Sequence, residues 1–519
     1  MAKAISPSFV LSLELKSNVL MFSVIEDELE ICRVMYNTVL GTYLKLETQM
    51  KREKSYKKWI REYRFVSKKL ERNPNDEVLV KEKKIIQKNF TSLRYKYSLN
   101  EYASHDWVKS IRKHFGNKVN SAVAQKTATR AWNTFSKKLF GQSKKVRFIK
   151  KGEMQSFEGK SNTTGWRYID GFIIYKGLHT ELSIKPKDDY ASEIIKNVSD
   201  KKEFSYKTND SYKKDFYRIK YVRIVKKTIR GKVRYFANLV IAGYPPSKNR
   251  KLGKGRVGID TGTSTIAVAS LTKAALFNLA DQVKDIAHEI KLIQGKMDRS
   301  KRAMNPTNYN VNGTLKKGKK TWVFSNRYQK LRSRFKELHR KQAKIRKFSH
   351  NRLANLLLPL GDHFFTETMN FKSLQKRKKE TEVCEKTGKI KRKKRFGKTL
   401  GNRAPATFMS ILKNKVKRYG GSFKEVNTRK FKASQYCHIR NGFFKKQLSE
   451  RWHKAGDINI QRDLYSAFLL MNSNDSGTGA IKKLCDETFN NFKNLHDQEI
   501  KTIIKQKKMI LNSGIITKN

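Results

Sequence analysis

Residues 256–270 read RVGIDTGTSTIAVAS, and this stretch decides the fold of the C-terminal half of the chain. An apolar strand ends at Asp260, a tight glycine turn follows, and a second apolar strand begins. Strands that read as continuous apolar runs are buried on both faces, as in sheets covered by helices. The stretch therefore predicts an α/β domain with an acidic residue at the end of a buried strand.

Two other acidic residues stand in comparable places. Glu367 follows the apolar pair Phe364-Phe365 near a predicted strand end, and Asp463 opens the short predicted helix DLYSAFLL. Carboxylates that converge in a fold repel one another, and a divalent cation such as Mg²⁺, which prefers hard oxygen ligands, would neutralise them. Two such ions can activate water and stabilise the leaving oxygen of a phosphodiester. Read singly, each residue has a plainer explanation as a turn residue, a strand end or a helix cap.

The charge of the whole chain points to a polyanionic partner. The 519 residues include 115 Lys and Arg against 45 Asp and Glu, a formal net charge of +70. Such a charge repels itself in a compact state, and bound nucleic acid would relieve it. A membrane surface is the competing polyanion, but no apolar run reaches the ~18 residues that would span a bilayer. Four distant cysteines without a CxxC pair predict a reduced, intracellular protein.

The N-terminal half alternates between strand and helix patterns. Residues 8–15 predict a strand, and residues 27–140 carry apolar stripes at helical spacing. Residues 146–244 then alternate like strands, and 216–243 form a hairpin around a TIRG turn. Because the polar positions of this hairpin are largely Lys and Arg, we expect a small basic β-barrel that suits nucleic-acid backbones.

The C-terminal half carries a long basic helix. Residues 325–347 repeat apolar positions at three and four spacing, with Ser325 as a plausible N-cap. We expect a charged, mobile loop at 375–402, an amphipathic helix at 406–420 and a strand at 421–428. The last ~35 residues are polar and Lys-rich, and we expect a frayed helix or a tail there. The cations chosen as candidate nucleic-acid contacts lie on the long helix: Arg327, Lys330, Arg334, Arg340, Lys341 and Lys344.

Three sequence blocks together resemble the TnpB family of transposon-encoded, RNA-guided nucleases, relatives of type V CRISPR effectors. VGIDTGTSTIAVAS resembles the first RuvC motif, FFTETMNFKSL the second, and QRDLYSAFLL the third. Their order and spacing cover residues 256–470, about half of the chain, and the N-terminal half fits the family layout more loosely. The resemblance implies an RNA-guided DNA endonuclease in which base pairing reads the target sequence.

The resemblance also implies the roles of individual residues. Asp260, Glu367 and Asp463 would be the catalytic, metal-binding carboxylates, holding two Mg²⁺ ions or Mn²⁺ in their place. Asp457 is the rival for the third position, and Asp362 and Glu380 are weaker rivals for Glu367. The partners would be a guide RNA and target DNA, with no membrane, in the cytoplasm of a prokaryotic cell and at the nucleoid when bound to DNA.

One departure from the family concerns zinc. The family commonly carries a four-cysteine zinc ribbon before its third motif, whereas residues 434–456 offer Cys437, His438 and His453 without paired cysteines. A closed zinc site requires four Cys or His ligands. We expect a degenerate, metal-free ribbon in which aromatic residues pack in place of the metal.

The expected fold class is a multidomain α/β chain with an RNase H-like RuvC nuclease domain, a basic β-barrel wedge domain and a helical recognition domain. The expected divisions are the first wedge strand at 1–26, the recognition domain at 27–145, the rest of the wedge at 146–250, the nuclease domain at 251–475 with a helical insertion at 275–352, and a basic tail at 476–519. Other functions stay open: a CRISPR-associated effector of the same fold, a nuclease-dead RNA-guided repressor, or a guide-independent accessory protein of transposition.

Overall fold

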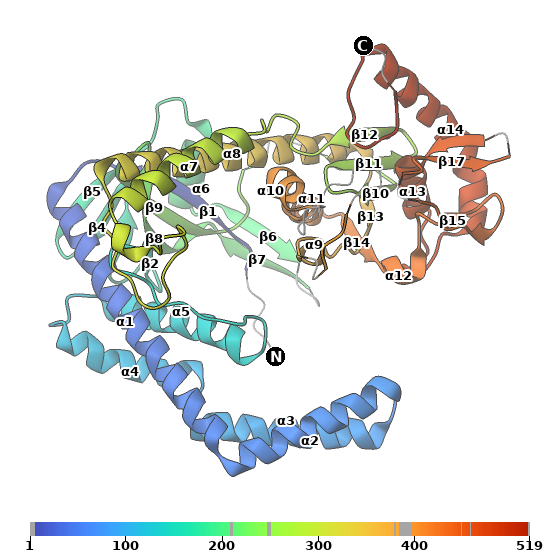
Figure 1. Cartoon of the computed structure of the whole chain (residues 1–519). Coiled ribbons are helices and arrows are strands. Elements are labelled where there is room, and N and C mark those ends of the chain that lie inside the picture. Colours follow the sequence, from blue (N-terminus) through green and yellow to red (C-terminus); the bar gives the residue numbers. More distant parts are fainter. Residues whose placement is uncertain are drawn as a thin grey trace. The chain divides into compact units, whose positions relative to one another are not determined.

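The computed structural model in Figure 1 describes residues 6–207, 211–246, 251–377, 380–383, 396–447, 449–456 and 458–516. The chain divides into two compact units, Met1–Pro246 and Ser247–Asn519, and each is considered by itself. Among the described residues, none of the helices combines the length and apolarity that crossing a bilayer requires. The fold is mixed α/β, as the sequence predicts.

Unit 1 is built on an antiparallel sheet with the order β2-β8-β9-β1-β5-β4-β3. The predicted first strand and the long basic hairpin are confirmed, and Arg230 and Gly231 close the hairpin with φ of 51° and 79°. The strands are β1 (Ser8–Leu15), β2 (Ser156–Glu158), β3 (Arg167–Ile169), β4 (Phe172–Tyr175), β5 (Leu178–Ser183), β8 (Arg218–Ile229) and β9 (Lys232–Ala242), with a separate hairpin of β6 (Glu203–Lys207) and β7 (Tyr212–Phe216).

This sheet is open within the described residues, so the prediction of a closed barrel is not met. The two edge strands β2 and β3 are three residues long, and each pairs with one neighbour. Residues 159–165, which join them, read GKSNTTG, a run that favours turns over strands. The ladder therefore stops at both edges before it can close.

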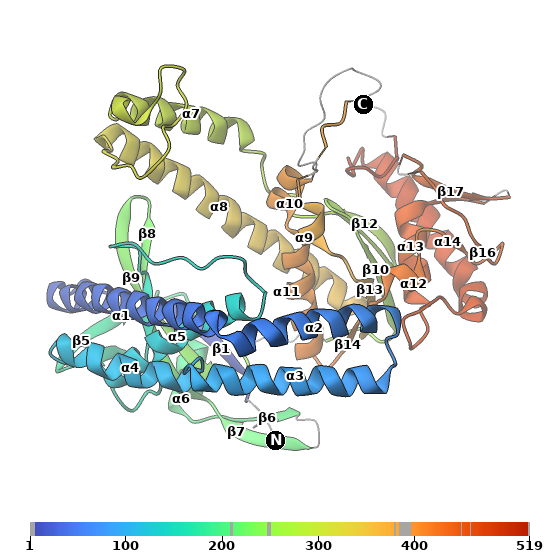
Figure 2. The same cartoon turned by 60° about the horizontal axis from the view of Figure 1, so that its bottom comes forward.

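Helices cover this sheet and extend from it. They are α1 (Val19–Arg52), α2 (Lys54–Arg72), α3 (Glu77–Lys96), α4 (Glu101–His114), α5 (Ser121–Leu139) and α6 (Asp189–Ser199). The first helix begins earlier than predicted, because the Asn18 side chain accepts a hydrogen bond from the Met21 amide and caps it. Tyr43 of α1 stacks on Phe135 of α5 in the shared core, and α2 and α3 form an antiparallel pair (Figure 2).

Unit 2 contains a five-stranded sheet with the order β12-β11-β10-β13-β14. The strands are β10 (Arg256–Thr261), β11 (Thr265–Ser270), β12 (Ala274–Asn278), β13 (His363–Glu367) and β14 (Ser422–Val426). The first three form an antiparallel meander, whereas β13 and β14 run parallel to β10. The strand–turn–strand prediction for residues 256–270 is confirmed.

Helices lie on both faces of this sheet. The helix α13 (Arg462–Met471) packs on β10 and β11, and α14 (Lys482–Lys505) packs beside it. The opposite face is covered by α11 (Pro405–Arg418) and the end of α8 (Asn326–Leu357). Side chains alternate between the two faces, so that Ile259 and Phe364 contact the second group of helices while Phe365 contacts the first.

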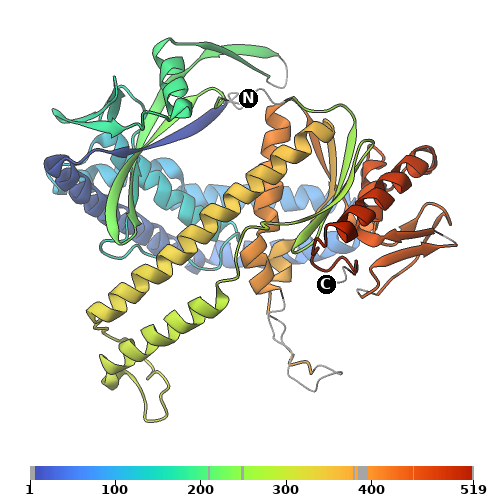
Figure 3. The ribbon, with the colours of Figure 1, turned by 90° about the horizontal axis from the view of Figure 1, so that it is seen from above.

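The remaining elements refine the predictions. The predicted long helix is α8, capped by Ser325, and it continues to Leu357 beside α7 (Ala287–Ala303) (Figure 3). The predicted loop at 375–402 contains a short helix, α10 (Gly397–Arg403), and residues 378–379 and 384–395 of that loop lie outside the described part. The segment predicted to be a frayed helix or a tail contains the helix α14, which buries Cys485, Phe492 and Ile503 in the core, so the prediction of a tail is wrong for these residues. The other short elements are α9 (Phe371–Leu374), α12 (Thr428–Phe431), β15 (Tyr436–Cys437), β16 (Gly442–Phe443), β17 (Trp452–Ala455) and β18 (Ile458–Gln461).

Candidate functional site

Asp260 and Glu367 lie at the same end of two paired parallel strands. The last register pair of β10 and β13 is Ile259 with Thr366, so the two acidic residues are next to each other in the ladder. Alternation along each strand places both on the sheet face that α13 covers. Both residues are half-buried, and solvent therefore still reaches them.

Asp463 reaches this place from α13. It lies in the first turn of that helix, where Gln461 is the N-cap and accepts a hydrogen bond from the Leu464 amide at 2.8 Å. The Gln461 side-chain amide donates to Asp463 Oδ2 at 3.3 Å. The cap therefore both starts the helix and orients its carboxylate.

Gly258 permits the close approach of α13 to the sheet. A Cβ at this position would meet the Ala467 carbonyl oxygen at 1.9 Å and the Met471 amide nitrogen at 2.3 Å. Both atoms belong to the helix backbone, which cannot give way as a flexible side chain can. Gly258 is two residues before Asp260 on the same face, so the contact holds α13 directly beside the carboxylates.

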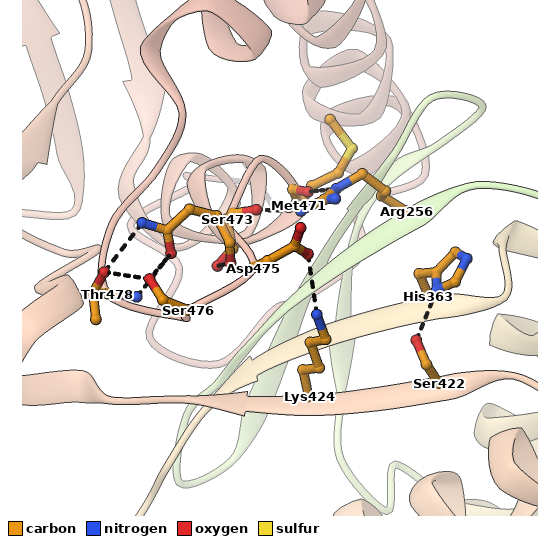
Figure 4. A network of polar contacts seen from close by, with 10 residues as sticks. Arg256, His363, Ser422, Lys424, Met471, Ser473, Asp475, Ser476 and Thr478 are labelled. Carbon is orange, nitrogen blue, oxygen red and sulfur yellow. Dashed lines mark hydrogen bonds and ion pairs between the residues drawn. The ribbon is translucent and has the colours of Figure 1, made fainter.

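The far end of α13 is fastened to the start of the same strand, as Figure 4 shows. Arg256 donates hydrogen bonds to the carbonyl of Met471, at 2.7 Å, and to that of Ser473. The Arg256 guanidinium also lies 4.3 Å from the centroid of the Phe365 ring. With its C-terminal end fixed at the start of β10, the helix directs its N-terminal end, and Asp463, toward the end of β10.

Two further contacts in this network join the sheet to the segment after α13. Lys424 of β14 pairs with Asp475 at 3.1 Å, and the starts of β13 and β14 are joined by His363 Nδ1 and Ser422 Oγ at 2.7 Å (Figure 4). The contact between His363 and Ser422 lies at the end of the sheet opposite Asp260 and Glu367, and Lys424 lies midway along β14. Neither contact involves the carboxylates of the site.

The three carboxylates influence one another electrostatically. Burial raises the pKa of Asp260 well above its ordinary value, and the negative charges of Asp463 and Glu367 raise it further. Burial raises the pKa of Glu367 to about 7, against the opposing effect of a hydrogen bond from the Ala433 backbone. The structure thus brings the three predicted acids into one electrostatic cluster.

Arg462 is a part of this site that the sequence analysis missed. Its charge partly offsets the rise in the pKa of Asp260, and its Nε lies 3.6 Å from Asp463 Oδ1. Hydrogen bonds from its Nη1 to the carbonyl oxygens of Glu450, at 2.9 Å, and Gln447, at 3.2 Å, hold the guanidinium in place. Its position next to Asp463 was the only available signal, and a neighbouring cation is common in so basic a chain.

The chemistry of the donor set fits a hard divalent cation. Three carboxylates face one arginine that compensates only part of their charge, so a half-buried excess of negative charge remains. Mg²⁺ or Mn²⁺ binds such oxygen ligands and would neutralise this charge. Within the described residues, however, no three His, Cys, Asp or Glu side chains are arranged closely enough to hold a metal ion as they stand. The cluster therefore has the ligands of a metal site without a formed coordination shell.

The rival acidic residues are placed differently. Asp362 precedes β13 and accepts a hydrogen bond from the Gly255 amide at 3.0 Å, so it lies a strand length away from Glu367. Glu380 is exposed in a bend. Asp457 lies outside the described residues. The geometry favours Glu367 over its two rivals.

The predicted degenerate ribbon is organised around Tyr465 of α13. His438 Nδ1 lies 2.6 Å from the Tyr465 hydroxyl, and the His453 ring stacks on the Tyr465 ring at a centroid distance of 4.4 Å. Burial lowers the pKa of both histidines to about 4. Cys32, Cys437 and Cys485 are buried free thiols, and Cys384 lies outside the described residues.

The candidate nucleic-acid contacts lie along α8. Five of the six are exposed: Arg327, Lys330, Arg334, Lys341 and Lys344. Arg334 forms an ion pair with Glu289 of α7 at 2.9 Å. Arg340 is half-buried and paired with Glu337 at 2.6 Å, which makes it the weakest candidate of the set.

Comparison with known proteins gives weak likenesses only. No family model matches the chain, and no curated protein matches it. Among solved structures, a Cas12f1–sgRNA–target DNA complex is similar with 13% identity over 90% of this chain and 99% of the other, at a TM-score of 0.40. A CRISPR–Cas12f ternary complex is similar with 14% identity over 89% of this chain and 99% of the other, at a TM-score of 0.22. Likenesses of this strength establish neither family nor function.

Proposed function

We propose that the chain is an RNA-guided DNA endonuclease of the TnpB type, whose unit 2 hydrolyses phosphodiester bonds with two Mg²⁺ ions. The observation that carries this proposal is the convergence of Asp260, Glu367 and Asp463 from two strand ends and one helix start. Residues so far apart in sequence form one electrostatic cluster. Strongly perturbed carboxylates in a half-buried cluster are typical of functional sites.

The topology of unit 2 supports an RNase H-like domain. A three-stranded antiparallel meander is extended on the side of its first strand by two strands parallel to it, in the order β12-β11-β10-β13-β14. Asp260 is the last residue but one of β10, the first strand of this sheet in chain order, and Glu367 is the last residue of β13, the fourth. The resemblance of the surrounding motifs to the first and second RuvC motifs implies that these two carboxylates are catalytic.

Bound Mg²⁺ would activate a water molecule and stabilise the leaving oxygen. Asp260, Glu367 and Asp463 would hold the ions. Because the pKa values of Asp260 and Glu367 are raised, metal binding would compete with protons at these two carboxyls. Arg462 would compensate part of the negative charge when no cation is present. Gly258 and Arg256 would keep α13, and with it Asp463, at a fixed distance from the strand ends.

The polyanion partner is supported by charge. The net charge of +70 and the exposed cations on α8 fit a structured RNA and a DNA strand, because phosphate contacts supply most of such affinity. RNA guiding itself comes from the resemblance of the three motifs to TnpB. Guide RNA and target DNA are therefore the proposed partners.

The test begins by sequencing the RNA that co-purifies with the full chain and by programming cleavage of a matching DNA. Asp260→Ala, Glu367→Ala and Asp463→Ala should each abolish Mg²⁺-dependent cutting while RNA and DNA binding persist. Glu380→Ala, at the exposed rival position, is the matched control and should cut normally. Near-normal cutting by any of the three variants would refute that carboxylate assignment.

The same experiment separates the other functions. DNA binding without cleavage by the unaltered chain, in the presence of Mg²⁺ and Mn²⁺, would favour a nuclease-dead repressor. Heterogeneous nucleic acid in place of a discrete RNA would favour a guide-independent accessory protein.

A further inference from the structure

A cavity of about 230 Å³ opens beside Glu367, on the sheet face opposite α13. Its floor is formed by Thr261 and Thr366, at the ends of β10 and β13, and its walls come from α9, α11 and β14. Glu367 lines the cavity and also belongs to the carboxylate cluster. A ligand in this cavity would therefore lie next to the place where we expect the scissile phosphate.

The two threonines of the floor offer no free hydroxyl to a ligand. Thr366 is 2% exposed, and its Oγ1, which makes no hydrogen bond within the described part of the chain, is closed off from solvent. The Thr261 hydroxyl lies 3.3 Å from the Met409 sulfur. Besides Glu367, the polar side chains that line the cavity and remain open to a ligand are Ser410, Lys413 and Glu425.

The walls are flat and polarizable. Phe371, Phe423, Met369 and Met409 line the cavity, and Lys413 Nζ lies over the Phe423 ring at 5.9 Å from its centroid. At the rim, Lys413 is paired with Glu425 at 2.6 Å. Aromatic and methionine walls with a few polar groups suit a planar heteroaromatic ring, whose faces stack while its edge forms hydrogen bonds.

We propose that this cavity receives one unstacked nucleobase of the DNA strand that is cut, next to the scissile phosphate. The inference rests on the proposed nuclease function and adds a base-binding subsite to it. A base must leave its stack to enter such a cavity, which costs least in single-stranded DNA. The subsite therefore favours a displaced or already unpaired strand over an intact duplex.

Base insertion is tested with cleavage silenced by Asp463→Asn. The RNA-bound full chain is mixed with a matching single-stranded oligonucleotide that carries 2-aminopurine at successive positions, and fluorescence is read at each position. We expect a change confined to one or two positions, next to the bond that the unaltered chain cuts. Ser410→Trp, which places a large ring at the cavity mouth on α11, should abolish this local change, whereas Thr407→Trp, an exposed substitution on the same helix, should preserve it.

Cleavage by the otherwise unaltered chain gives a second readout. An abasic site at the inserted position should slow cutting about tenfold relative to abasic sites elsewhere, the scale of a single stacked base.

The outcomes separate this subsite from the nuclease function. Cutting that tolerates an abasic site at every position, together with uniform 2-aminopurine signals, would overturn the subsite and leave the nuclease intact. A local fluorescence change without any cutting by the unaltered chain would retain the subsite as a base-binding pocket and refute the nuclease. Equal effects of Ser410→Trp and Thr407→Trp would also refute the subsite, because only the first substitution reaches the cavity.

Discussion

Glu367→Gln should stabilise the protein when no divalent cation is present. Burial raises the pKa of Glu367 from its ordinary value of 4.5 to about 7. Because the folded state binds this proton more tightly than the unfolded state, stability is highest at low pH and falls as the pH rises from 4.5 through 7. The interval of about 2.5 pH units corresponds to at most about 3.4 kcal/mol, at about 1.36 kcal/mol per unit.

The expected gain is smaller than this limit, on the order of 1–3 kcal/mol at pH 8, because solvent reaches the half-buried carboxyl. Glutamine removes the charge and can still accept the hydrogen bond from the Ala433 backbone. The assay is thermal unfolding of the full chain in EDTA at pH 5, 6, 7 and 8. The midpoint of the variant should exceed that of the unaltered chain at pH 8, and the difference should shrink toward pH 5.

Mg²⁺ should stabilise the unaltered chain more than it stabilises Glu367→Gln. The unaltered chain should gain stability with Mg²⁺ concentration, since an ion that binds only the folded state stabilises it by mass action. Glu367→Gln should gain less. Glu487→Gln, on an exposed position of α14, is the control and should follow the unaltered chain under all conditions. A lower midpoint for Glu367→Gln at pH 8 in EDTA would refute the view that the buried charge of Glu367 destabilises the metal-free protein.

Three other predictions concern the supports of the site and its surroundings. Gly258→Ala should displace α13, lower the thermal midpoint and reduce cleavage more strongly than binding, and a fully active, fully stable variant would contradict the role given to this contact. Replacing Lys330 and Lys341 by Ala should weaken RNA binding. In a salt titration, the slope of log affinity against log salt concentration should fall in magnitude by about 0.7–0.9 for each lost phosphate contact. An unchanged slope would exclude these two lysines of α8 from the interface. In the ribbon region, purified protein should contain no stoichiometric zinc by elemental analysis, and one zinc per chain would refute this. Tyr465→Ala should be destabilised by about 3–5 kcal/mol in urea unfolding, because that ring fills the centre of the same region. An unchanged unfolding curve would contradict this role of Tyr465.

The positions of the acidic residues were predictable because each stands at the end of a periodic segment. Asp260 and Glu367 end apolar strands and Asp463 begins an apolar helix, and such ends meet at the edges of sheets. Neither Gly258 nor Arg462 carried such a signal. Their roles depend on which backbone passes close to Gly258 and which carbonyls hold Arg462, and both follow from tertiary packing alone.

The errors in the prediction have physical causes as well. The basic hairpin was located correctly, but barrel closure depends on two three-residue edge strands whose short length no alternation pattern reveals. The C-terminal segment was expected to be a frayed helix or a tail because it is polar and rich in lysine. Its apolar residues nevertheless recur at helical spacing, at Cys485, Phe489 and Phe492, and burial against α13 decides the outcome.

The arrangement of unit 2 explains how repelling carboxylates can be held together without a cation. The bonds from Arg256 and the close contact at Gly258 fix α13 at places removed from the charges, so the repulsion at Asp463 works against a helix that is already anchored. Arg462 offsets only part of that repulsion. The rest of the repulsion, together with burial, raises pKa values in the cluster and lowers stability near neutral pH. A bound divalent cation would neutralise the carboxylates and so stabilise the fold. Thermal stability can therefore report metal binding without a cleavage assay.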